Sequence, residues 1–149
     1  MIESFVWLLA GLLVLVTVSV HYEAIMLISD RVMPWAQKHV HNRRVMPVVI
    51  AALMLGHIAE IWMFALALKL LVQFPVFGSL QGGTGNGWGD FLYLSSVDYT
   101  SLGDNGLRII GPARAIVASE TLIGMLMIAW SASFTYLKME QVWKDHHKK

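Results

Sequence analysis

The sequence lacks cysteine altogether and has little charge. Without cysteine, disulfides, thiolate metal sites and cysteine nucleophiles are excluded. Only 14% of the 149 residues are charged and 56% are hydrophobic, whereas soluble domains carry about a quarter charged residues. The net charge is +1 and no basic stripe with interleaved aromatics is present, so we expect no nucleic-acid partner. The apolar residues gather in long runs, which indicates that lipid is the solvent.

The features of a cleaved signal peptide are also missing at the N-terminus. Met1, Ile2 and Glu3 bring no Lys or Arg, and no small-x-small cleavage site follows the first apolar run. We therefore expect this run to be retained as a membrane-spanning helix.

Three apolar runs are long enough to cross a bilayer, which takes about 20 residues. They cover residues 4–28, 46–71 and 113–137. We predict an all-α membrane protein, with three transmembrane helices plus a short re-entrant helix and loop. The expected parts are an N-terminal helix (1–28), a basic connector (29–45), a main domain (46–139) and a polar tail (138–149).

The basic residues predict the orientation of the chain. The connector and the tail hold most of the Lys and Arg, and the first residues hold none. Because basic loops stay in the cytoplasm, we expect the N-terminus outside and the C-terminus inside. The predicted location is a plasma membrane, of the bacterial inner-membrane type.

A short apolar segment separates the second and third runs. A glycine-rich stretch (72–89) precedes it, and residues 90–100 are too few to span, which is typical of a re-entrant helix. Asp90 is a candidate N-cap. Irregular backbone such as 101–106 is tolerated in a membrane only where protein or water shelters it. Four copies around an axis would supply that shelter, although Asp-Asn-Gly is also an ordinary turn signal.

This order of elements resembles the potassium-channel pore family. Tyr99-Thr100-Ser101-Leu102-Gly103 is similar to the Thr-Thr-Val-Gly run that opens the family's selectivity filter, and Trp130–Leu137 resembles part of its inner helix. The resemblance covers about residues 46–143, and it is closest to small bacterial members with one extra N-terminal helix. It implies a homotetramer, not an enzyme, whose partners are itself, lipid and monovalent cations. No cofactor is expected beyond potassium and sodium ions in the filter.

The resemblance also assigns the filter residues. They are Thr100, Ser101, Leu102, Gly103, Asp104 and Asn105. Asp104 stands where the family has Tyr, as in the T-V-G-D-G filter of bacterial sodium–potassium channels, and Asn105 replaces the second Gly. Weak selectivity between potassium and sodium is therefore expected. Gly124 resembles the family's gating hinge, and it could equally be a small residue for close helix packing.

Three acids within the apolar segments are candidates to support the filter: Asp98, Glu60 and Glu120. Asp98 either holds the filter or simply bonds the helix end. At about 1.5 Å per residue, Glu60 lies about 21 Å from the inner end of its helix and Glu120 about 10 Å from the outer end of its own. These depths are nearly level, so the two could share a proton, brace the short helix, or lie on the ion path.

The histidines allow a different class of function. His57 and Glu60 are three residues apart and share a helix face, so a membrane redox or metal protein using His57, Glu60 and Glu120 is an alternative. A non-conducting, pore-like subunit is another. The depth estimate places His21 about 4 Å and His57 about 16 Å from the inner face. It predicts that no single iron can bind both, and that His57 is a core histidine bonded to Glu60 or to a backbone carbonyl.

Overall fold

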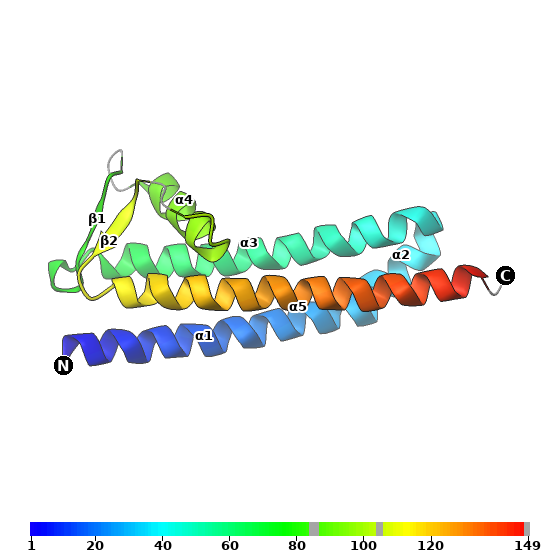
Figure 1. Ribbon diagram of the computed structural model, residues 1–149, viewed down its shortest axis with the longest axis horizontal. Helices are drawn as coiled ribbons and strands as arrows, with labels where there is room; N and C mark the ends of the chain where they lie inside the picture. Colours follow the sequence, from blue (N-terminus) through cyan, green and yellow to red (C-terminus); the bar gives the residue numbers. More distant parts are fainter. Residues whose placement is uncertain (84–86, 104–105, 148–149) are drawn as a thin grey trace.

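A computed structural model describes residues 1–83, 87–103 and 106–147. Three helices in it are long and apolar enough to cross a membrane: Ile2–His39, Val45–Leu71 and Arg114–Lys144. They lie side by side along the long axis of the molecule, with the two termini at opposite ends (Figure 1). The chain is thus a mostly helical, membrane-embedded protein with three candidate spans.

The first long helix is built from three consecutive pieces. α1 (Ile2–Leu27) passes through a π-helical turn (Ile28–Val32) directly into α2 (Met33–His39). The prediction that this helix ends at residue 28 is therefore wrong. Pro34 does not stop the helix: it lies in the first turn of α2, directly after the π-helical turn Ile28–Val32. Much of the connector is helical as a result.

The third long helix also continues past its predicted end. α5 (Arg114–His147) includes most of the segment 138–149 that we expected to be a polar tail. Lys, Glu, Gln and Met in this stretch are good helix formers. An ion pair of 2.6 Å between Lys144 and Glu140, one helical turn apart, adds local support.

The segment between α3 (Val45–Leu71) and α5 contains a two-stranded sheet that the sequence analysis did not predict. β1 (Ser79–Gln81) pairs antiparallel with β2 (Arg108–Ile110), with Leu80 opposite Ile109. The end of α3 and the start of α5 therefore lie at the same end of the bundle, where the two strands pair (Figure 1).

The predicted short helix is α4 (Trp88–Tyr99), which starts two residues earlier than expected. Gly87 occupies the N-cap position without a side-chain hydrogen bond, so Asp90 is not the N-cap. The helix packs against both α3 and α5. At its C-terminal end, Tyr99 is fully buried.

Two apolar clusters divide the interior. The larger one joins α1, α3, α4 and α5, and includes Phe64, Phe91 and Ile116. The smaller one joins α1, α2 and α3 at the other end, around Ile25 and Val49. The α1, α3 and α5 residues that lie between these clusters in sequence carry the buried polar side chains described next.

Candidate functional site: a buried polar layer

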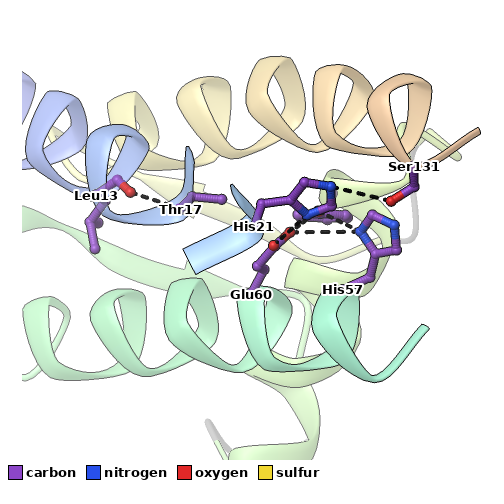
Figure 2. Close-up of polar contacts among 7 residues, drawn as sticks. Leu13, Thr17, His21, His57, Glu60 and Ser131 are labelled. Carbon is purple, nitrogen blue, oxygen red and sulfur yellow. Dashed lines mark hydrogen bonds and ion pairs between the residues drawn. The ribbon is translucent and has the colours of Figure 1, made fainter. Parts of the chain in front are cut away.

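A layer of buried polar side chains connects all the long helices and α4. Its members are His21 of α1, His57 and Glu60 of α3, Tyr99 of α4 and Ser131 of α5. Figure 2 shows His21, His57 and Glu60 converging on one point, with Ser131 facing His21 from the opposite side. The exposed fractions are 0% for Glu60 and 1% for His21, so water does not screen these groups.

Glu60 is the centre of the layer. Its Oε1 accepts a hydrogen bond of 2.8 Å from Nδ1 of His21, and its Oε2 accepts one from the hydroxyl of Tyr99. Nδ1 of His57 lies 3.6 Å from Oε2 and 2.9 Å from the Tyr99 hydroxyl. One carboxylate therefore links α1 and α4 to α3, and both of its oxygens accept hydrogen bonds, as a buried carboxylate requires.

His21 extends the layer to α5. Its Nε2 lies 3.2 Å from the hydroxyl of Ser131, and its ring centroid lies 5.5 Å from that of Trp130. The ring centroids of His21 and His57 are 5.2 Å apart. The predicted separation of these two histidines by depth is therefore wrong. It assumed a first span that ends at residue 28, whereas the continuous helix from Ile2 to His39 places His21 at the level of His57.

Glu120 takes no part in this carboxylate–histidine group. It is fully buried on α5, and its Oε2 lies 3.4 Å from the hydroxyl of Ser95 on α4. Its Oε1 has no hydrogen-bond partner among the described residues. Glu60 and Glu120 each contact α4 through a different residue, Tyr99 and Ser95, which fits bracing of the short helix better than a shared proton.

Gly124 is a point of close approach between α5 and α4. A Cβ built on this glycine would lie 2.2 Å from the backbone oxygen of Tyr99 and 2.9 Å from its Cγ. No larger residue fits there without moving the end of α4. Of the two interpretations of Gly124, this geometry favours the packing one.

The predicted filter begins where α4 ends. The Thr100 hydroxyl bonds the Ser96 carbonyl at 2.7 Å, Ser101 has a φ of 57°, and Gly103 has a φ of 102°. Leu102 is 79% exposed. The remaining predicted filter residues, Asp104 and Asn105, lie outside the described residues. Within the described part of the segment, Ser101, Leu102 and Gly103 are all exposed in the single chain.

Asp98 lines a pocket of about 450 Å³ between α4, β2 and α5. Arg108 and Arg114 line the same pocket, together with Ser101 and Gly103 at the start of the predicted filter. The Asp98 Oδ2 has no hydrogen-bond partner among the residues the structure describes. Burial raises the pKa of Asp98 from its ordinary value to about 6.

This raised pKa predicts a pH-dependent stability. The folded protein holds the Asp98 proton more tightly than the unfolded chain does. Protonated Asp98 therefore contributes to the stability of the fold below about pH 4, and this contribution is lost as the pH rises through about 6. We expect Asp98→Asn to remove this part of the pH dependence, and Asp30→Asn, at an exposed acid, to leave it unchanged. Melting temperatures between pH 4 and 8 measure the effect. Parallel curves for wild type and Asp98→Asn would contradict it.

The sequence analysis did not predict that His21, Tyr99 and Ser131 belong to one buried layer. His21 was separated from His57 by the depth estimate, and Tyr99 and Ser131 were noted only within the family-like motifs. One signal was available: Glu60 has no Lys or Arg near its own depth, so its partner had to be a histidine or a hydroxyl.

Comparison of the chain with protein-family models, with curated proteins and with solved structures finds no match.

Proposed function

We propose that the chain is the subunit of a homotetrameric channel for monovalent cations. One observation supports this proposal above the others. The segment between α3 and α5 leaves and returns at the same end of the bundle, and α4 ends against the middle of both helices, at Glu60 and Gly124. A short helix that stops partway along two spans, followed by irregular backbone, is the arrangement of a pore loop.

The physical reason for fourfold assembly is the segment that starts at Thr100. Its backbone follows the buried end of α4, and Ser101, Leu102 and Gly103 are all exposed in a single chain. Exposed irregular backbone at membrane depth needs protein or a water-filled cavity around it. Four such strands around an axis would shelter one another and direct carbonyl oxygens toward an ion.

The same proposal assigns roles to the neighbouring residues. Ser101, Leu102 and Gly103 contribute the inner ion sites, and Asp104 and Asn105 line a wider outer entrance. Glu60 and Glu120 hold α4 in place through Tyr99 and Ser95. In this proposal the basic connector and the C-terminal end of α5 face the cytoplasm, and the filter lies near the outer side of a plasma membrane of the bacterial inner-membrane type.

Assembly and conduction can be tested on the purified protein. We expect a native mass of four chains in mild detergent, and potassium or sodium uptake by liposomes that contain the protein. Gly103→Ala should abolish uptake, because the φ of 102° is strained for alanine although a Cβ meets no other atom of the same chain. Gly89→Ala, where a Cβ also has room and the backbone is helical, is the matched control. A stable monomer or dimer would refute the proposal, and a tetramer without flux would favour a non-conducting subunit.

Selectivity is the finer part of the same experiment. A ring of Asp104 carboxylates attracts cations in general, and without Tyr and Gly at positions 104 and 105 the outer carbonyl sites are lost. Under bi-ionic potassium and sodium we expect a reversal potential near zero, with chloride excluded. Asp104→Tyr combined with Asn105→Gly should shift the reversal potential toward that of potassium. A wild-type pore that is already strongly potassium-selective would contradict this assignment.

A further inference from the structure

The carboxylate–histidine group contains the donor atoms of a metal site. His21, His57 and Glu60 each offer one ligand atom, and these atoms all lie within 4.8 Å of one another. All three side chains are buried, and they come from two different helices. Two imidazoles and one carboxylate form a donor set that zinc and related divalent transition metals bind in proteins.

We propose that His21, His57, Glu60 and Tyr99 form a site for one divalent transition-metal ion of the Zn²⁺ type. The site is distinct from the proposed ion path, since its residues belong to the packed interface of α1, α3 and α4. It also differs from the metal site considered from the sequence, because His21 and Tyr99 take the place of Glu120.

The distances are close to those of a tetrahedral site. Zn²⁺ bonds nitrogen and oxygen at about 2.0–2.1 Å, so two ligands of one ion lie about 3.3 Å apart and no more than about 4.2 Å apart. The contacts of 2.8 Å between His21 and Glu60, 3.6 Å between His57 and Glu60, and 2.9 Å between His57 and Tyr99 lie within about 0.5 Å of that value. The Tyr99–Glu60 contact is shorter and would lengthen on metal binding, and the ligand atoms of His21, His57 and Glu60, which lie within 4.8 Å of one another, would draw together. Side-chain rotations that move the most distant ligand atoms by less than about 1 Å would close the site.

Charge balance selects Tyr99 as the fourth ligand. A divalent ion beside one carboxylate would leave a net positive charge in a buried membrane site, which is costly. The Tyr99 hydroxyl already points its proton at Glu60. If metal binding releases that proton, Glu60 and the Tyr99 phenolate together neutralise the ion. Both histidines then remain neutral, with their Nδ1 lone pairs free for the metal.

Ser131 supplies the outer contact that such sites use. A metal-bound histidine normally donates its other ring N–H to an oxygen, which orients the ring. Nε2 of His21 lies 3.2 Å from the Ser131 hydroxyl, so this N–H has an acceptor when Nδ1 binds the metal. A hydroxyl can also donate, so Ser131 suits the metal-free state in which Nδ1–H donates to Glu60.

The test uses the full chain, purified in mild detergent without a histidine tag and with His146 and His147 changed to Asn. Metal content is measured by elemental analysis, and affinity by Zn²⁺ titration. We expect one Zn²⁺ per chain and a tyrosinate difference spectrum on binding. His21→Asn should weaken binding at least 100-fold, and Ser131→Ala should weaken it 10- to 100-fold. Tyr99→Phe should abolish the spectral change.

The control is the pair His39→Asn and His41→Asn, which alters exposed histidines of the connector and should leave the affinity unchanged. If His21→Asn does not fold, Ser131→Ala still tests the site because it removes no ligand. Absence of Zn²⁺ binding, or binding that is lost in the control and kept in Ser131→Ala, would overturn the proposal. The assay does not measure flux, so this result is independent of the proposed channel.

Discussion

Gly124→Ala is expected to destabilise the protein by about 2–3 kcal/mol, because it overpacks a rigid contact. The new Cβ would lie 2.2 Å from the Tyr99 backbone oxygen and 2.9 Å from the Tyr99 carbonyl carbon. Neither atom belongs to a flexible side-chain end, so α4 must move away from α5. That movement would strain the hydrogen bond from Tyr99 to Glu60 as well.

Gly11→Ala is the matched control for this prediction. Gly11 also lies within a long helix, and a Cβ there meets nothing within 4 Å. Alanine in a helix interior is favoured over glycine by about 1 kcal/mol, so this variant should be neutral or slightly stabilising. Thermal unfolding followed by circular dichroism in mild detergent compares the two. Equal melting temperatures for Gly124→Ala and wild type would show that the contact yields easily.

The position of Gly124 links this loss of stability to the proposed activity. Tyr99 immediately precedes Thr100, where the predicted filter begins. Any displacement of the end of α4 would be passed directly to the filter strand. We therefore expect Gly124→Ala to reduce ion uptake in liposomes under conditions in which the protein still folds, while Gly11→Ala conducts normally.

Glu60→Ala is expected to cost about 3–5 kcal/mol, the largest effect of any carboxylate considered, because it breaks a buried charged network. Its removal leaves Nδ1 of His21 and the Tyr99 hydroxyl without their acceptor, in a site that excludes water. It also removes the side chain that joins α1 and α4 to α3. Thermal unfolding in mild detergent measures the loss.

Two further variants serve as comparisons for Glu60→Ala. Glu60→Gln keeps one carbonyl acceptor and the side-chain volume, so it should lose less stability than Glu60→Ala. Glu23→Ala removes an exposed acid from α1 and should change stability by less than about 0.5 kcal/mol. If Glu60→Ala were as mild as Glu23→Ala, the buried layer would not hold the helices together.

The sequence predicted the spanning segments and the short helix well, since both depend on local composition. A bilayer requires about 20 apolar residues for a span, so Val45–Leu71 could be located from hydropathy alone. The ends of helices were less predictable. The helix that begins at Ile2 continues through the π-helical turn Ile28–Val32 as far as residue 39, although polar residues begin in that turn.

The candidate site could be predicted only in part. An intramembrane carboxylate such as Glu60 marks a functional or structural site by its cost alone. Its partners could not be identified by counting residues along each helix, because the depth scale assumed that each span begins and ends at the membrane surface. The pairing of β1 with β2 was equally hidden, since three-residue strands leave almost no periodic pattern.

The amino-acid sequence by itself determined that this chain is a membrane-embedded protein with three candidate spans, and where the short helix between the last two lies. These properties follow from local hydropathy, which each segment carries independently of the others. Only the tertiary structure decided that Glu60 contacts His21, 39 residues before it, and Tyr99, 39 residues after it. The same holds for the close packing of the end of α4 against Gly124. Such contacts depend on the relative height and rotation of packed helices, which no single segment encodes.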